Sequence, residues 1–330
     1  MTVIQMFEKY DKAGKIASKV RKQAAKKATA GMKVVDLVDW IENEIRKTGA
    51  GLSFPCNVSI NEIAAHYTSP PSDDTLLCEG DIVKIDLGAE VDGYISDTAV
   101  TVIIEGDNKE PVDEDGNPLK MPGRLDDGNP VVTEDELEER YRIIDASSSA
   151  LENAISIIKE GTTLEQIGTV VYETMTEKGY NPIRNLTGHS LEQYNLHAGL
   201  SVPNIPEKNP YVLKEGDHIA VEPFATNGVG LVNDIPQHFI YSYLRTRPLR
   251  QPDSKKLLNR IKNNNAHFPF SRRWFLDQFD EHRLNRAMRP LITSRAIYPY
   301  NALKEKTDCM VAQTEHTIIV EKDGCYVTTE

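Results

Sequence analysis

The strongest structural pattern in the chain lies in Glu79-Gly-Asp-Ile-Val-Lys-Ile-Asp-Leu-Gly-Ala-Glu-Val-Asp-Gly-Tyr-Ile-Ser-Asp-Thr-Ala-Val-Thr-Val102. Two β-rich runs flank Asp92-Gly93, a dipeptide typical of tight turns, so this stretch predicts a β-hairpin. Side chains alternate along a strand, which places Val83 and Ile85 on one face of the first run and Asp86 on the other.

The predicted hairpin holds two carboxylates within apolar strands, Asp86 and Asp97. Adjacent antiparallel strands can bring such a pair within several ångströms of each other. Two like charges that close and half buried are costly unless a shared proton or a divalent metal ion compensates them. An edge hairpin with solvated aspartates explains this stretch equally well, so the rest of the chain has to decide.

Composition limits the classes of protein. The chain has 330 residues, 39% of them hydrophobic, a net charge of −12 and a pI near 5.3, which fits one large domain or two ordinary ones and disfavours a nucleic-acid binder as the default. The four cysteines form no CxxC pair, so neither a zinc knuckle nor a disulfide framework is expected. No apolar run reaches transmembrane length, and residues 1–30 lack a signal-peptide core, so we expect a cytoplasmic protein without membrane contact.

Apolar periodicity predicts several helices. The first, over residues 3–29, is rich in Lys and Arg. A solvated helix face is the simpler interpretation, and a contact with an anionic partner such as ribosomal RNA is the alternative. A possible capping box, Thr133-Glu-Asp-Glu136, opens another helix. The predicted helices cover residues 3–29, 33–47, 133–158, 163–178, 252–264 and 272–289, and strands are expected within 308–320 and 325–329.

Two segments differ in composition from their surroundings. Residues 105–135 are acidic and poor in large apolar residues, which predicts a surface excursion. Their spacing does not complete an EF-hand, which requires a later bidentate Glu. Residues 234–305 are basic, aromatic and punctuated by Pro, so we expect a small helical subdomain inserted before the last strands. A wall beside an active site is the preferred role for this insert, and nucleic-acid binding the alternative.

The sequence also contains an internal echo. Glu79-Gly-Asp81 precedes Asp86 in the same way as Glu215-Gly-Asp217 precedes Glu222, at an offset of 136 residues. Gly31 and Gly161 open similar stretches that end at Gly49 and Gly179. The pattern indicates two related α/β halves, each contributing a carboxylate, with a site at their junction.

The candidate ligands together suit a metal centre. Four carboxylates and one imidazole match the preferences of hard or borderline divalent ions such as Mn, Fe, Co or Zn, bridged by water. The candidates are Asp86, Asp97, His189, Glu222 and Glu315, with His66 and His197 nearby in motif.

Several motifs resemble those of the type 2 methionine aminopeptidases, members of the "pita-bread" metallopeptidases. The stretches that carry the resemblance cover both halves: Phe54-Pro55, Ala64-Ala-His66-Tyr-Thr68, Lys84-Ile-Asp86-Leu-Gly88, Ile95-Ser-Asp97, Asn185-Leu-Thr-Gly-His189-Ser190, Leu196-His197-Ala-Gly199, Val221-Glu222-Pro-Phe224 and Ala312-Gln-Thr-Glu315-His-Thr317. Pro269-Phe-Ser-Arg-Arg-Trp274 resembles part of the helical insert of type 2 enzymes. The acidic stretch is longer than usual, and the Lys-rich extension of eukaryotic members is absent, so the archaeal-like form is expected.

The resemblance implies a pita-bread α/β (α+β) fold, with two pseudo-symmetric halves around a dimetal centre. The catalytic domain would comprise residues 1–233 and 306–330, and the type 2 insert residues 234–305. The chain would act as a monomer, because the two halves complete the site within one chain.

The resemblance also implies roles for individual residues. Asp86 would chelate one metal ion and His189 the other, Asp97 and Glu315 would bridge them, and Glu222 would bind beside His189 and exchange protons with the attacking water. His66 and His197 would donate hydrogen bonds to the substrate and the developing oxyanion. Phe54 and Phe224 would line the pocket for the Met side chain.

The implied activity is removal of the initiator methionine from nascent chains and peptides whose second residue is small. The enzyme would use two divalent metal ions (Co, Mn, Fe or Zn), and the ribosome is a possible partner. An X-Pro peptidase of the same fold is one alternative, which the insert and the Asn185-Leu-Thr-Gly-His189 context disfavour. A non-catalytic relative that binds RNA or the ribosome is another, disfavoured because all five ligands are present.

Overall fold

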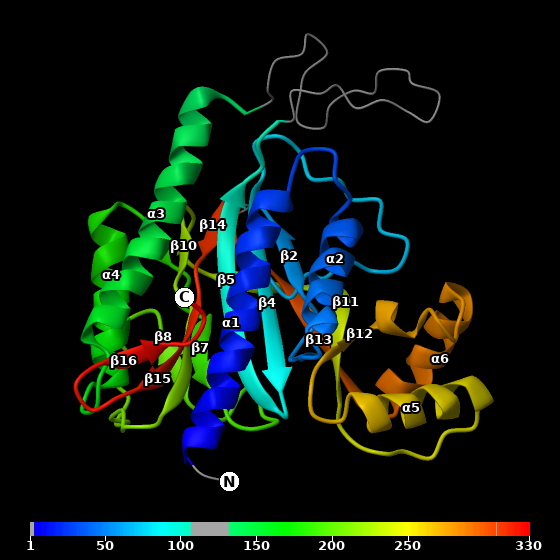
Figure 1. Ribbon diagram of the computed structural model, residues 1–330. Coiled ribbons are helices and arrows are strands. Elements are labelled where there is room, and N and C mark those ends of the chain that lie inside the picture. Colours follow the sequence, from blue (N-terminus) through cyan, green and yellow to red (C-terminus); the bar gives the residue numbers. More distant parts are fainter. Residues whose placement is uncertain (1–2, 107–131, 308) are drawn as a thin grey trace.

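Two helix-covered groups of strands lie side by side in the computed structural model, which describes residues 3–106, 132–307 and 309–330 (Figure 1). In the first group, helix α1 (Val3–Lys27) packs on β4 (Ile82–Val91) and β5 (Tyr94–Ile103), and α2 (Val34–Lys47) packs beside α1 on the same apolar core. Strands β1 (Gly51–Leu52) and β2 (Asn57–Ile60) both pair with the edge of β4 opposite β5, β1 near the end of β4 and β2 near its start. The predicted acidic excursion falls largely on residues 107–131, outside the described residues.

The hairpin is confirmed, and it is not an edge hairpin. Asp92 and Gly93 form its two-residue loop, with φ of 54° and 84°, the left-handed values that this turn needs. Val83, Ile85 and Leu87 are fully buried in the core under α1 and α2, and β4 has partners along both edges. The alternative of solvated aspartates on an edge strand is therefore wrong, because the strands that carry them lie inside the molecule.

The second group repeats this arrangement. Helices α3 (Glu134–Ile157) and α4 (Leu164–Glu177) cover β7 (Thr187–Ser190), β9 (His218–Val221) and β15 (His316–Val320). Strands β8 (Ser201–Pro203) and β16 (Cys325–Val327) complete this sheet, while β10 (Phe224–Thr226), β6 (Asn181–Pro182) and β14 (Val311–Gln313) form a smaller one. The predicted capping box of α3 is confirmed, since Thr133 Oγ1 accepts from the Glu136 backbone and the Glu136 carboxylate accepts from the Thr133 backbone.

The two groups share local details that follow the sequence echo. Gly80 and Gly216 both adopt a positive φ, of 88° and 90°. The carboxylate of Asp81 accepts the Cys78 backbone N–H at 2.8 Å, and that of Asp217 accepts the Lys214 N–H at 2.9 Å. The Glu-Gly-Asp turn therefore has the same conformation in both groups, and it precedes the strand that leads to a site carboxylate in each.

Strands β5 and β15 join the two groups. Ala99 and Glu315 exchange backbone hydrogen bonds, and the Thr101 hydroxyl donates to the Gln313 carbonyl at 2.7 Å. Thr317 Oγ1 donates to the Asp97 carbonyl at 2.6 Å and accepts from the Asp97 N–H. These contacts place Asp97 and Glu315 at the seam between the groups.

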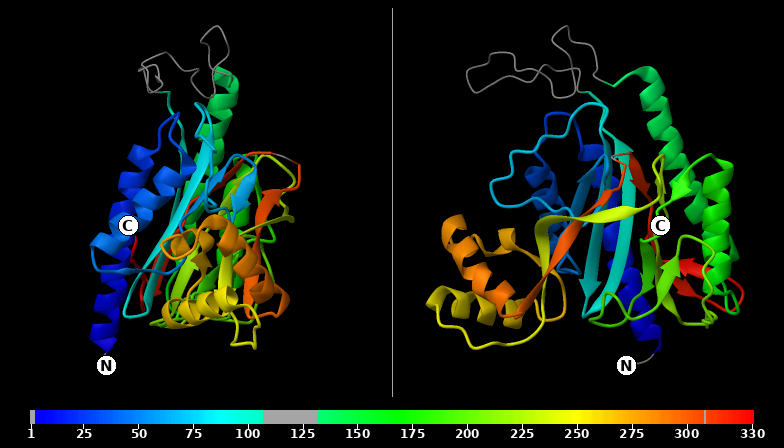
Figure 2. Two further views of the ribbon diagram at one scale, coloured as in Figure 1. Left: turned by 90° about the vertical axis from the view of Figure 1, so that its right-hand side faces the viewer. Right: turned by 180° about the vertical axis from the view of Figure 1, so that it is seen from behind.

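The third part of the molecule is the segment between β11 (Val232–Tyr243) and β13 (Ile297–Glu305). These two strands pair with each other, and β12 (Phe270–Ser271) and β3 (Ile63–Ala65) extend their sheet. Helices α5 (Pro252–Asn264) and α6 (Glu281–Thr293) pack together beside it on their own apolar core. Figure 2 shows α1 and α2 on one side of the strands and α5 and α6 toward the other.

The helix predicted over residues 272–289 is wrong as a single element. The structure has a short 3₁₀ helix, η1 (Arg272–Phe275), then a turn, then α6. The Asp280 carboxylate accepts the Arg283 backbone N–H and so begins a new helix, which continues past Pro290 to Thr293. Buried Phe275 and Phe279 hold the turn between them against the core of the insert.

Among the described residues, no helix is both long and apolar enough to cross a membrane.

Candidate metal centre and substrate pocket

The carboxylates of the hairpin lie diagonally across its two strands. Asp86 pairs with Ala99, and Gly88 pairs with Asp97, so the two acids are offset by two residues on the same face. Burial, followed by the charge of nearby Asp97, raises the pKa of Asp86. The sequence prediction that the strands bring them together is confirmed, and the register explains why they meet diagonally rather than directly.

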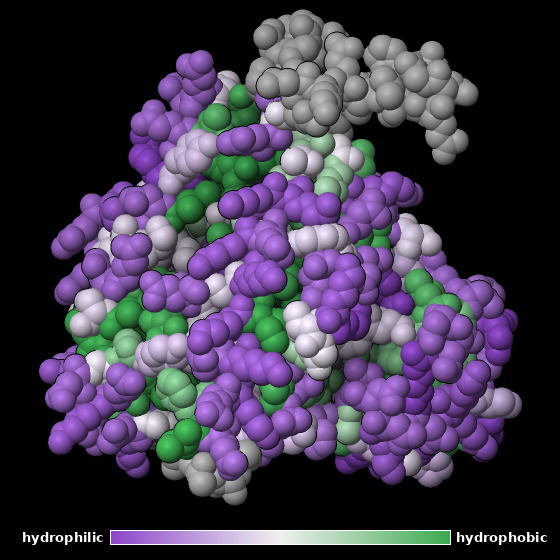
Figure 3. Space-filling view, in the orientation of Figure 1, coloured by the Kyte–Doolittle hydropathy of each residue, from purple (hydrophilic) through white to green (hydrophobic). Residues whose placement is uncertain are grey.

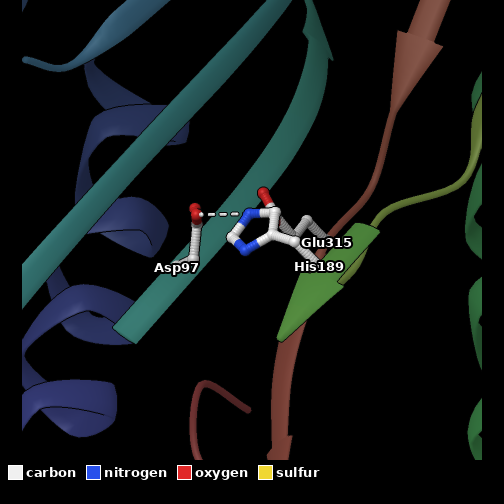
Figure 4. Close-up of side chains that lie close together, drawn as sticks. All are labelled: Asp97, His189 and Glu315. Atoms are coloured by element: carbon white, nitrogen blue, oxygen red, sulfur yellow. Dashed lines mark ion pairs between the residues drawn. The ribbon is translucent and has the colours of Figure 1, made fainter. Parts of the chain in front are cut away.

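Three side chains from three elements converge at the seam. One ligand atom from each of Asp97, His189 and Glu315 lies within 4.8 Å of the others, and all three residues are buried. His189 Nε2 is 3.4 Å from Asp97 Oδ2 (Figure 4). Asp97 comes from β5, His189 from β7, and Glu315 from the link between β14 and β15, so both halves contribute to the cluster.

Glycine next to His189 allows β7 to approach β9 closely. A Cβ atom on Gly188 would stand 2.2 Å from the Ala220 carbonyl oxygen, which leaves room for no side chain there. His189 itself pairs with Ala220 on β9, two residues before Glu222. The tight pairing of β7 and β9 therefore places His189 and Glu222 at the same end of the second sheet.

The cluster suits a divalent metal ion. Burial, followed by the charges of neighbouring carboxylates, raises the pKa values of Asp86, Glu222 and Glu315 well above their usual range. One oxygen each of Asp86, Asp97 and Glu315 is buried without a hydrogen-bond partner among the described residues. Buried, unpaired carboxylate oxygens beside an imidazole are costly unless a cation binds them, and this donor set fits borderline divalent ions.

All of the residues assigned to the site by sequence border one cavity of about 290 Å³. Its lining combines acids and histidines with aromatic and aliphatic side chains, as in many small-molecule sites. The lining residues are Phe54, Asn57, Ala65, His66, Asp86, Asp97, Asn185, Leu186, Thr187, His189, Leu196, His197, Glu222, Phe224, Ile240, Pro269, Tyr300 and Glu315.

Two histidines stand at the wall of this cavity. His66 has a φ of 62°, an uncommon conformation for a non-glycine residue, and its Nδ1 lies 3.1 Å from the Asn301 carbonyl oxygen. That contact assigns the proton to Nδ1 when the ring is neutral. Burial, then repulsion from His189 and His66, lowers the pKa of His197 to about 3, so its ring is neutral near pH 7.

Sequence reasoning missed several residues of the site. The Gln313 amide donates to Glu222 Oε2 at 3.2 Å and to Glu315 Oε2 at 3.5 Å, so it orients both carboxylates. Its position two residues before Glu315 was the available signal, because such residues share a strand face. Tyr300, whose ring lies edge-on to His66, and Pro269 and Ile240 line the cavity from the insert and its strands, and no local pattern indicated them.

A cluster of acids and histidine within a peptide-sized pocket defines a candidate metal-dependent hydrolase. The model of metallopeptidase family M24 matches residues 8–321, so the chain belongs to this family. The chain is 49% identical to the methionine aminopeptidase of Methanothermobacter thermautotrophicus over 328 residues, covering 99% of this chain and 100% of that protein.

Solved structures support the fold. A thermophilic Arx1 superposes with a TM-score of 0.78 at 19% identity, over 99% of this chain and 91% of the other. The methionine aminopeptidase of Rickettsia prowazekii gives a TM-score of 0.66 at 20% identity, over 100% and 99%. The expected pita-bread fold of two related halves is thereby confirmed.

Proposed function

We propose that this chain is a methionyl aminopeptidase that removes the N-terminal methionine of proteins and peptides whose second residue is small. The observation that carries the proposal is the convergence of Asp97, His189 and Glu315 at one end of a pocket with aromatic and aliphatic walls. The similarity of the whole chain to methionine aminopeptidases supports it, and the same similarity disfavours the X-Pro peptidase and the non-catalytic alternatives.

Asp86, Asp97, His189, Glu222 and Glu315 would hold two divalent ions, drawn from Co, Mn, Fe and Zn. Four carboxylates supply enough negative charge for two such ions, and Asp97 and Glu315, which cluster with His189, would be shared between them. When bound, these ions activate a water molecule and polarise the peptide carbonyl. The free α-amine of the substrate would bind beside them, which restricts cleavage to the first peptide bond.

The protein's own residues would then handle protons and orient the substrate. Glu222, which accepts a hydrogen bond from the Gln313 amide, would take a proton from water and pass it to the leaving amine. His197 would donate one N–H to the peptide carbonyl and the oxyanion that develops from it. Neutral His66 donates its Nδ1–H to the Asn301 carbonyl, so its Nε2 would accept an N–H of the substrate and would donate only when the ring is protonated. Because burial keeps His197 neutral, it donates from one ring nitrogen only.

The apolar walls would select methionine. Phe54 and Phe224 are both buried and face the cavity, and aromatic edges make favourable contacts with a thioether. A cavity of about 290 Å³ is large enough for a Met side chain, and crowding of the substrate beyond that side chain would exclude a bulky second residue.

The test is hydrolysis by metal-stripped protein before and after addition of Mn, Fe, Co or Zn. Met-Ala-Ser should release Met only with metal, whereas Met-Lys-Ser, N-acetylated Met-Ala-Ser and Ala-Pro-Gly should remain intact. His189→Ala should lose this activity with the fold unchanged by circular dichroism, while His282→Ala, at an exposed position, should keep it. Cleavage of the Pro peptide alone, or full activity of His189→Ala, would contradict the assignment.

We also propose that α1 contacts ribosomal RNA near nascent chains. Lys12, Lys19, Lys22 and Lys26 are exposed at helical spacing along α1, and Figure 3 shows a hydrophilic surface over this helix. A row of lysines on one helix of a chain with net charge −12 favours binding of a polyanion to that helix.

The test is co-sedimentation with ribosomes. A triple variant with Glu in place of Lys12, Lys19 and Lys22 should lose salt-sensitive co-sedimentation. The same change at exposed Lys208, Lys255 and Lys322 should leave co-sedimentation intact. If both triple variants lost co-sedimentation equally, net charge rather than a contact of α1 would explain the binding.

A further inference from the structure

Arg273 of η1 connects three separate segments through its guanidinium group. Its Nε donates to Asp39 Oδ1 at 2.6 Å, its Nη1 donates to the Ser69 carbonyl at 2.7 Å, and its Nη2 lies 2.8 Å from Glu42 Oε1. Asp39 and Glu42 belong to α2, and Ser69 follows His66 by three residues. The side chain is buried, so these contacts fix it in one geometry.

Glu42 is the buried counterpart of this arginine. It is 1% exposed, and its second oxygen accepts the Trp274 indole N–H at 2.6 Å. Arg46 adds a longer ion pair of 3.5 Å to the same oxygen. A planar guanidinium with fixed N–H directions matches this set of acceptors, whereas an ammonium group could satisfy only part of it. Removing either partner would leave the other with one weaker ion pair, Glu42 with Arg46 or Arg273 with half-exposed Asp39.

Polar contacts rather than apolar packing hold the insert at this place. A cleft of about 670 Å³ lies between parts of α2 and the insert. The contacts of Arg273 and Trp274 with Asp39 and Glu42 lie at its border. Pairing of β13 with β3 and β11 fixes the base of the insert. The η1 segment is not part of that base, and its side-chain hydrogen bonds to α2, within the described residues, come from Arg273 and Trp274.

The contacts of Arg273 lie a few residues from two walls of the substrate pocket. Ser271, two residues before it, pairs with Ile240, and Ile240 and Pro269 line the pocket. On the other side, the Ser69 carbonyl ends the short segment that starts at His66. The Arg273 guanidinium therefore links two sides of the pocket, which we call the Pro269–Ile240 wall and the His66 wall after their lining residues.

We propose that Arg273 is a positioning residue that sets the fit of the pocket around the first side chain of the substrate. It acts by holding the Pro269–Ile240 wall against the His66 wall, and Glu42 is its essential partner. This inference rests on the proposed function. It concerns selectivity, because a hydrophobic pocket discriminates between side chains through closeness of fit. One methylene group more or less changes kcat/KM by roughly 10–200-fold in such a pocket.

The test compares Arg273→Met and Arg273→Lys with Arg283→Met in metal-loaded enzyme. Arg283 also belongs to the insert, but it is partly exposed and pairs with Asp253 of the same insert, away from α2. The substrates are Met-Ala-Ser, norleucine-Ala-Ser and Leu-Ala-Ser. We expect Arg273→Met to raise KM for Met-Ala-Ser roughly tenfold with kcat within about threefold, and to narrow the preference for Met over Leu by a similar factor.

Arg273→Lys should recover part of the KM and part of the preference, and Arg283→Met should match the wild type. A uniform fall of kcat on all three peptides, with the Met-to-Leu preference unchanged, would overturn the proposal and leave Arg273 with a structural role.

If Arg273→Met fails to fold, Asp39→Asn serves in its place. It removes one contact of Arg273 with a half-exposed partner, so it should narrow the preference for Met over Leu by a smaller factor. An unchanged preference in Asp39→Asn and in Arg273→Lys would equally overturn the proposal. Failure of the wild type to cleave Met-Ala-Ser would instead refute the proposed function.

Discussion

His218 is a histidine at the start of β9 whose two ring nitrogens are buried and have no hydrogen-bond partner among the described residues. Its ring packs against Tyr10, with centroids 3.6 Å apart. Burial lowers its pKa to about 3, whereas the unfolded chain has a value near 6.5. The unfolded state therefore binds more protons between these two pH values, and the folded state loses stability as the pH falls below about 6.5.

We predict that His218→Phe makes the protein less sensitive to acid. At pH 5 the unfolded state gains about 2 kcal/mol from protonating this histidine, and a phenyl ring removes that gain while keeping the contact with Tyr10. Urea unfolding at pH 7.5 and pH 5 measures the difference. His282→Phe, at an exposed site on α6, should show the wild-type pH dependence, and parallel curves for His218→Phe and wild type would count against the assignment.

At the same scale, the sequence located the acidic residues of the pocket more readily than its apolar ones. Asp86 and Asp97 are conspicuous because charges within strands are costly, and strand register brings them together. The internal echo pointed to Glu222 as the counterpart of Asp86 in the second half. The placement of His189 and Glu315 beside them followed from resemblance to a family, since no spacing rule connects those residues to the hairpin. Tyr300 and Pro269 reach the pocket through the pairing of β11, β12 and β13, which only the tertiary structure reveals.

Among the elements, the pairing of β7 with β9 depends most on a single residue. The Cβ atom of Gly188→Ala would stand 2.2 Å from the Ala220 carbonyl oxygen and 3.2 Å from Val202 Cβ. Because the obstacle is backbone, the strands have to separate, and His189 moves with them. We predict a loss of about 1–3 kcal/mol in the free energy of unfolding, together with weaker metal binding.

Urea unfolding and calorimetric titration of the apo-protein with Mn measure both effects. Gly324→Ala is the matched control, because a Cβ atom there meets nothing within 4 Å and its φ is not positive. Gly188→Ala with wild-type stability and affinity would mean that β7 and β9 tolerate a wider spacing than their contacts indicate.

Local signals predicted elements well where caps or turns were present. Thr133 and Asp92-Gly93 specified a helix start and a hairpin loop that the structure confirms. The wrong prediction of one helix over residues 272–289 also concerns a cap. Asp280 caps the start of α6, and it lies in the middle of the pattern that was interpreted as a single helix. The buried aromatics of η1 kept the apolar pattern continuous across that break.

At the scale of the whole molecule, the two halves meet through the candidate metal centre. The first half contributes Asp86 and Asp97, and the second contributes His189, Glu222 and Glu315. The internal echo of the sequence indicated such a junction, and the equal turn geometry at Gly80 and Gly216 explains why each half directs a carboxylate toward it. Without cations, four acids from two halves would repel each other across the seam. Burial first, and this repulsion second, raise the pKa values of Asp86, Glu222 and Glu315.

Metal removal should therefore destabilise the molecule as a whole rather than the pocket alone. A ligand present at 100 times its Kd stabilises the folded state by about 2.7 kcal/mol, which for a chain of this length is on the order of 4 °C in Tm. Scanning calorimetry with a chelator and with added Mn or Co measures the shift. Asp97→Asn should lose most of this shift, because it removes a carboxylate that the cluster shares.

The same variant separates metal binding from simple relief of charge. Asp97→Asn lowers the number of carboxylates at the seam from four to three, so its metal-free Tm should equal or exceed that of the metal-free wild type. If the wild type melted at one temperature with and without metal, the cations would not hold the halves together. If metal-free Asp97→Asn melted well below metal-free wild type, the Asp97 carboxylate would stabilise the seam mainly through its contact with His189, and repulsion among the acids would be the smaller effect.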